Sequence, residues 1–170
     1  MQKEDMFMKS IEVSLCLFIF IFTAACSNQH DQPHFIGYVV DKSESRVLVV
    51  SSSPQDFSDN GGVKEYYDAI SLAGVSNEVK IGQLVSVWVD GPIAESYPMQ
   101  AEASKVEIVD EEKPEGANMK VNEVIQQAIH KVNRMVAIRD VEYNENTEMW
   151  NVELVEIIDG SVFEVEILDE

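Results

Sequence analysis

The stretch FIGYVVDKSESRVLVV, residues 35–50, contains the pattern that decides the fold of this chain. Two runs rich in valine and other β-branched or aromatic residues flank a short polar segment, residues 41–45. Such runs on either side of a polar turn are typical of two antiparallel strands joined as a hairpin. The sequence therefore predicts strands over residues 35–40 and 46–50.

Three further strands are expected on the C-terminal side of this hairpin, over residues 66–72, 85–89 and 105–109. The intervening residues 51–62 are rich in serine, asparagine and glycine, which favour loops. Five short strands, with a glycine-marked turn before the fourth, fit a small barrel of the oligonucleotide/oligosaccharide-binding (OB) type. We therefore expect an OB-like β-barrel over residues 35–109.

The hydrophobic pattern changes after an acidic linker, residues 110–117, which contains proline and glycine. The residues that then recur at helical spacing are Val121, Val124, Ile125, Ala128 and Val132. Asn118 is a plausible N-cap for this helix. Strand-like runs follow over 136–143, 150–158 and 162–168. The expected fold class is thus mainly β, or α+β, with a helix plus three-stranded antiparallel sheet over residues 118–170.

The pair Asp159-Gly160 is a preferred sequence for a two-residue hairpin turn between the last two strands. Such a turn would place Leu154 opposite Val165, Val152 opposite Ile167, and Glu153 opposite Glu166. One face of the sheet would then be apolar, as expected when a helix covers it, and the other face acidic.

Like charges placed opposite each other destabilise a sheet, so a basic partner would relieve the repulsion. We therefore expect Glu153, Glu164 and Glu166 to form an interaction surface for a basic envelope protein or peptide. The alternative is an ordinary solvated face in an acidic chain.

The N-terminus has the features of a secretory signal. Lys3 and Lys9 precede an apolar run, residues 13–22, and small residues lead to Cys26. The run is shorter than the roughly 18 residues of a membrane-spanning helix, so residues 1–25 are expected to be removed. The acidic residues near Met1 suggest Met8 as an alternative start. Residues 26–34 read as a polar tether.

The tract Phe22-Thr23-Ala24-Ala25-Cys26 resembles the lipobox of bacterial lipoproteins, apart from Thr23, where that family has a branched aliphatic residue. The resemblance implies a diacylglycerol thioether on Cys26, with palmitate among its acyl chains. Two acyl chains make a stable anchor. The expected location is the extracytoplasmic face of the cell membrane; cleavage by the ordinary signal peptidase would instead release a soluble protein.

Several motifs stand out within residues 35–109: Gly37-Tyr38-Val39-Val40, Ile81-Gly82-Gln83 followed by Val85, Val87 and Val89-Asp90-Gly91, and Ser96-Tyr97-Pro98 with Gln100-Ala101. With these motifs the chain resembles a YobA-like group of uncharacterised lipoproteins of Bacillus-type bacteria. The resemblance implies a lipobox and a barrel but no catalytic residues. Residues 119–168 are similar in topology to the PepSY module of secreted and membrane proteins, some of which are thought to restrain peptidases.

Composition excludes several classes of function. The net charge of −19 repels nucleic acid and anionic lipid headgroups. Cleavage before Cys26 would leave a single cysteine, and thus no intrachain disulfide.

The loop 56–61 spaces oxygen donors as in a calcium-binding EF-hand, but Tyr67 stands where the closing glutamate belongs. We expect no metal and no cofactor, since the histidines also lack metal-site spacing.

Trp88, Tyr66, Tyr67 and Tyr97 could form a stacking surface for sugars, although aromatic residues in strands are more often part of the core. Tyr97 precedes Pro98, so the bond between them is a candidate for the cis form.

The sequence contains no nucleophile elbow or phosphate-binding loop. We therefore expect a non-enzymatic binding or interaction protein. The alternatives are an envelope hydrolase that uses carboxylates of loops 53–68 or 91–100, and a calcium-binding module.

Overall fold

The computed structural model describes residues 32–170, of which Pro33–Glu170 form one compact unit. The expected signal peptide, the lipid-attachment residue Cys26 and most of the tether lie outside the described residues. None of the described helices is long and apolar enough to cross a membrane.

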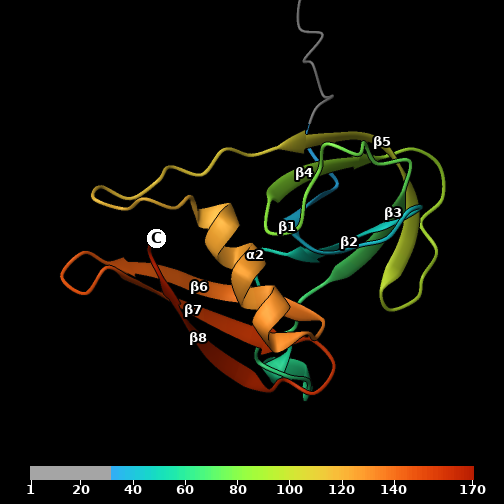
Figure 1. Ribbon diagram of the computed structural model, residues 1–170. Coiled ribbons are helices and arrows are strands. Elements are labelled where there is room, and N and C mark those ends of the chain that lie inside the picture. Colours follow the sequence, from blue (N-terminus) through green and yellow to red (C-terminus); the bar gives the residue numbers. More distant parts are fainter. Residues whose placement is uncertain (1–31) are drawn as a thin grey trace, which may run out of the picture. The chain divides into compact units, whose positions relative to one another are not determined.

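The N-terminal part is a closed five-stranded barrel with the strand order β1-β2-β3-β5-β4 (Figure 1). Its strands are β1 (Phe35–Lys42), β2 (Val47–Ser51), β3 (Ala69–Ala73), β4 (Leu84–Val89) and β5 (Met99–Ile108). Neighbouring strands are antiparallel except β3 and β5, which are parallel. The predicted OB-like barrel is confirmed.

Two barrel strands begin three or more residues away from their predicted first residue. β3 begins at Ala69 rather than 66, because Tyr66 instead forms an isolated bridge with Gln55 at the base of the long β2–β3 loop. β5 begins at Met99 rather than 105, because its first residues pair with β3. This part of β5 alternates polar and small residues, so it lacks the apolar run by which strands are recognised.

Glycine is required where backbones approach closely. A Cβ at Gly37 of β1 would lie 2.1 Å from the carbonyl oxygen of Val50 in β2. Gly82, just before β4, has a φ of +90°, and a Cβ there would lie 2.2 Å from the carbonyl oxygen of Asn122. Because Asn122 lies in the first turn of the following helix, Gly82 lets the barrel contact that helix directly.

The C-terminal part consists of α2 (Val121–Val132) and a sheet of order β6-β7-β8. Its strands are β6 (Val136–Asn144), β7 (Met149–Glu156) and β8 (Val162–Leu168). The predicted helix plus three-stranded antiparallel sheet is confirmed, and α2 lies across one face of the sheet (Figure 1).

The predicted cap of α2 is wrong. Lys120, not Asn118, is the N-cap, and the Glu123 side chain accepts a hydrogen bond from the Lys120 backbone N–H at 2.9 Å. Asn118 lies outside the helix because its own N–H donates to the carboxylate of Asp169, at 2.6 Å.

The predicted register between β7 and β8 is also wrong. Four residues, 157–160, form the turn, since the N–H of Glu156 donates to the carbonyl oxygen of Ser161 at 2.8 Å. The buried Glu156 carboxylate stabilises this wider turn by accepting the N–H groups of Ile158 and Asp159, at 2.9 and 2.7 Å. The pairing therefore shifts by two residues, which leaves every side chain on its predicted face.

Two hydrophobic clusters hold the unit together. One fills the barrel interior and includes Val39, Val49 and Val85. The other, which we call the shared cluster, joins the outer side of the barrel to α2 and the C-terminal sheet. Side chains of β2 contribute to both, because alternate residues of a strand face opposite sides. The two halves of the chain are therefore packed on a common core.

Candidate functional site

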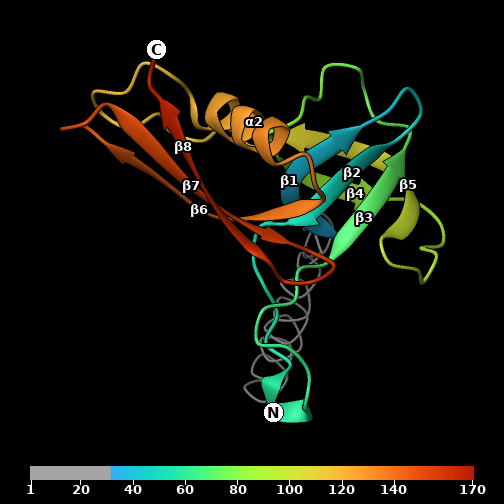
Figure 2. The same ribbon diagram turned by 60° about the horizontal axis from the view of Figure 1, so that its bottom comes forward.

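A groove of about 370 Å³ lies where two loops of the barrel meet the turn between β7 and β8. The β2–β3 loop contributes Val63, Glu65 and Tyr66, the β4–β5 loop contributes Tyr97, and the turn contributes Ile157, Ile158 and Asp159. Figure 2 shows the β2–β3 loop extending from the barrel on the side of the sheet away from α2.

The aromatic wall of the groove is fixed by ring contacts. The Tyr66 ring lies 5.7 Å from that of Tyr97 and meets Phe57 edge-on at 5.5 Å, measured between centroids. The Tyr97 hydroxyl donates a hydrogen bond to the Tyr67 carbonyl oxygen at 2.8 Å. Burial raises the pKa of Tyr97 to about 12, and nearby Tyr66 and Asp68 contribute. The phenol therefore stays neutral and keeps its donor role.

Apolar side chains of the groove remain accessible to solvent. Ile158 is 64% exposed, Val63 58% and Tyr97 40%. These residues lie together although they come from three separate segments of the chain. Exposed apolar side chains that gather in a groove mark a binding surface more often than scattered ones do.

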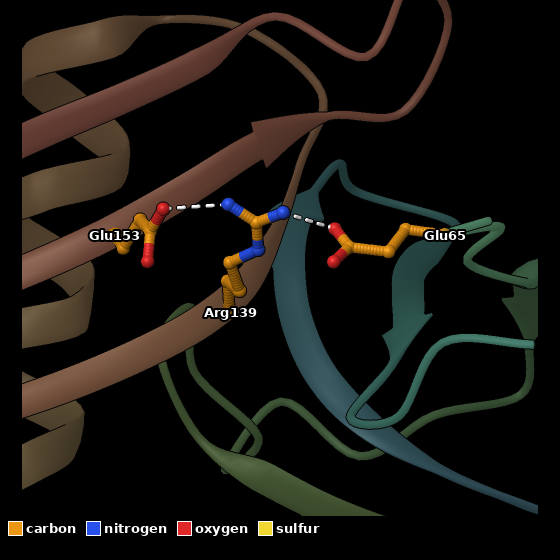
Figure 3. A network of polar contacts seen from close by, with 3 residues as sticks. All are labelled: Glu65, Arg139 and Glu153. Carbon is orange, nitrogen blue, oxygen red and sulfur yellow. Dashed lines mark hydrogen bonds and ion pairs between the residues drawn. The ribbon is translucent and has the colours of Figure 1, made fainter.

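Arg139 of β6 connects the groove to the C-terminal sheet (Figure 3). Its guanidinium donates to Glu153 of β7 at 2.6 Å and, on its other side, to Glu65 of the β2–β3 loop. Hydrogen bonds from Arg139 to Glu153 and Glu65 raise the pKa of Arg139 further above its ordinary value. These two ion pairs hold the part of the β2–β3 loop that contains Glu65 against the C-terminal sheet.

The three glutamates predicted to form an interaction surface lie on the sheet face that α2 does not cover, but their pairing differs from the prediction. Glu153 is opposite Glu164, and Glu166 is opposite Asn151. Glu164 and Glu166 are exposed, whereas Glu153 is partly buried in its ion pair with Arg139. Arg139 thus supplies within the molecule part of the relief expected from a basic partner.

The acidic face continues directly into the groove. Val155, which lines the groove, lies two residues along β7 from Glu153 and therefore on the same face. Beyond Glu153, a second, shallow hollow is lined by Met149, Asn151 and the exposed glutamates of β8. One face of the sheet thus combines an apolar groove at one end with an acidic surface along the rest.

The predicted aromatic surface is brought together in part. Tyr66, Tyr67 and Tyr97 all line the groove, and the Tyr97-Pro98 bond is cis. Trp88 lies elsewhere, on β4, with the Lys105 ammonium 4.4 Å from its ring centroid. Val63, Ile158 and Arg139 were not singled out from the sequence. An apolar residue within a glycine- and serine-rich loop, such as Val63, is the signal that could have identified the first of them.

The calcium-like loop uses its first carboxylate locally. Asp56 accepts hydrogen bonds from the N–H and the hydroxyl of Ser58, at 2.8 and 2.6 Å. Within residues 32–170 no group of three or more histidine, cysteine, aspartate or glutamate side chains could hold a metal ion. That this loop does not bind calcium stays a prediction.

The fold and groove define a class of protein: an OB-like barrel packed on a helix-and-sheet module, with an open groove where the two meet. Residues 36–110, which span the barrel strands, match the family described as a protein of unknown function, DUF3221. The chain has no significant match among curated proteins or among solved structures.

Proposed function

We propose that this chain is a lipid-anchored, extracytoplasmic binding protein without catalytic activity. The observation that supports the binding role is the groove, where Tyr66, Tyr97 and Ile158 offer exposed apolar surface beside the barrel loops. The β4–β5 loop, which carries Tyr97, is one of the elements that OB barrels use to bind ligands. A groove of this volume suits a side chain or a short segment of a ligand.

Two resemblances noted in the sequence support this proposal. The YobA-like lipoproteins combine a lipobox with a barrel, and the barrel region here matches an uncharacterised family. The order of a helix followed by three antiparallel strands agrees with the proposed likeness to PepSY modules. Restraint of a peptidase, which is thought to be a role of some of those modules, would itself be a binding function.

The carboxylates near the groove favour binding over hydrolysis. Glu65 is held by Arg139, Glu156 accepts two N–H groups of its own turn, and Asp159 accepts the N–H of Ser161 at 2.8 Å. A glycosidase requires two carboxyl groups that flank a bond of the substrate, one of them free to donate a proton. The groove carboxylates are instead engaged in holding the loops.

The anchor is tested by changing its cysteine. Cys26→Ser, expressed in a lipoprotein-producing bacterium, should shift the protein from the membrane fraction to unprocessed or released forms and abolish labelling by palmitate. Cys16→Ser, which changes the other cysteine of the chain, is the matched control and should leave the membrane fractionation and the palmitate labelling unchanged. Membrane retention of Cys26→Ser, together with no lipid label on the unsubstituted protein, would contradict the proposal.

A further inference from the structure

We propose that the groove and the adjoining acidic face bind an extended cationic peptide segment. One apolar side chain of the peptide enters the groove, and basic side chains at alternate positions meet Glu164 and Glu166. This inference rests on the proposed binding function and names the chemistry of its ligand.

The spacing of the sheet residues supports an extended ligand. On the face that α2 leaves open, the pair Val155 and Val162 lies at the groove end, followed by Glu153 with Glu164 and then Asn151 with Glu166. Successive residues on one face of a strand repeat at about 6.6–6.8 Å. An extended peptide has the same repeat, so its alternate side chains can match these positions one after another.

The negative charge of the surface favours a positively charged ligand. Neither the groove nor the hollow over β7 and β8 has a lysine or arginine among its described lining residues. The nearby Arg139 is already bound to two glutamates, whereas Glu164 and Glu166 form no ion pair within residues 32–170. With a net charge of −19, the chain attracts a cationic segment and repels an acidic one.

The combination of features favours a peptide over a neutral sugar. Tyr66 and Tyr97 could stack on a sugar ring, but a neutral oligosaccharide would leave the exposed carboxylates without counter-charges. A peptide with one aliphatic and several lysine side chains satisfies both the apolar groove and the acidic face. Burial of Ile158, which is 64% exposed in the unbound protein, would add to its affinity.

The test uses the full-length protein in detergent and a fluorescent synthetic peptide with one leucine followed by lysines at alternate positions. We expect saturable binding, measured by fluorescence anisotropy, that weakens as the salt concentration rises. A peptide with glutamate in place of each lysine should bind about 100-fold more weakly, since like charges across an interface oppose binding. Chitohexaose, a neutral oligosaccharide, should not compete.

Variants on the surface separate the two contributions. Ile158→Ser should weaken binding about fivefold, as expected for loss of one apolar contact. The double variant Glu164→Gln, Glu166→Gln should weaken binding about tenfold and reduce its dependence on salt. The matched controls are Ile108→Ser and the double variant Glu44→Gln, Glu78→Gln, which change exposed residues of the barrel and should bind as the parent does. Thermal melting of each variant checks that it is folded.

Several outcomes would overturn the inference. Equal binding of the glutamate peptide would show that charge plays no part. Binding of chitohexaose that is lost in Ile158→Ser would make the groove a sugar site, and the proposed binding role would stand without the peptide. Absence of binding by either peptide would also refute the cationic ligand. The proposed anchor is decided separately by the Cys26 experiment, so the two failures can be told apart.

Discussion

At the scale of single residues, Asp169 connects the end of the chain to the start of α2. Its carboxylate accepts the N–H groups of Asn118 and Met119, at 2.6 and 2.8 Å, and the indole N–H of Trp150 at 3.0 Å. Burial alone would raise the pKa of Asp169, but these hydrogen bonds hold it below its ordinary value. The charged form of Asp169 therefore stabilises the fold.

We predict that Asp169→Asn lowers the free energy of unfolding at pH 7, because an amide NH₂ would face the backbone N–H donors of Asn118 and Met119. The folded pKa is depressed, so this stabilisation is present above the unfolded pKa, near 3.8, and is lost as pH falls through the folded pKa. Urea unfolding from pH 7 to pH 2 should show the parent and the variant converging at the acidic end. Glu170→Gln is the control, and an equal loss in it would contradict the prediction.

At the scale of elements, β7 and β8 carry like charges that differ in their surroundings. Glu153 and Glu164 are directly opposite each other, but Glu153 alone contacts Arg139. Removal of either charge ends the repulsion between Glu153 and Glu164, whereas removal of the Glu153 charge also weakens the ion pair with Arg139.

We predict that Glu164→Gln raises the free energy of unfolding by about 0.2–1 kcal/mol, through loss of the repulsion. Glu153→Gln should leave it unchanged or lower it by about 0.5 kcal/mol, since the lost ion pair offsets the relief. Glu166→Gln, opposite the neutral Asn151, is the control. Thermal and urea unfolding measure all three variants, and a stabilising effect of Glu153→Gln as large as that of Glu164→Gln would refute this account.

At the scale of the whole molecule, the shared cluster couples the barrel to the C-terminal sheet. It contains Leu48 and Val50 of β2 together with Val136 and Ile138 of β6, all of them buried. Separation of the two halves would expose this surface to water, at a cost of roughly 25 cal/mol per Å² of apolar area. The two halves should therefore unfold together.

The two tryptophans of the chain report on the two halves, since Trp88 lies in β4 and Trp150 in β7. In each of the variants Trp150→Phe and Trp88→Phe, the fluorescence of the remaining tryptophan should change in the same urea transition as the circular dichroism signal. Ile138→Ala, added to Trp150→Phe, should lower the stability reported by Trp88 by about 2–4 kcal/mol, although Ile138 lies outside the barrel strands. Two separate transitions, or an unchanged Trp88 midpoint, would show independent halves.

The sequence by itself determined the strands, the helix and the face on which each side chain lies. Alternation along β7 or β8 is a local property, and it arises because one side of each strand faces the core. Even the wrong register at Asp159-Gly160 kept the acidic face acidic, since a shift of two residues preserves that alternation. The first part of β5 was not predicted, because its residues alternate polar with small side chains.

Only the tertiary structure decided what depends on residues far apart in the chain. Arg139 joins Glu65 across 74 positions, and Asp169 reaches Asn118 across 51. The groove arises in the same way, because loops after β2 and β4 meet the turn after β7. The hydrophobic periodicity of a segment predicts which of its side chains face the core, but not which distant side chains they will contact. The candidate site consists of such long-range contacts.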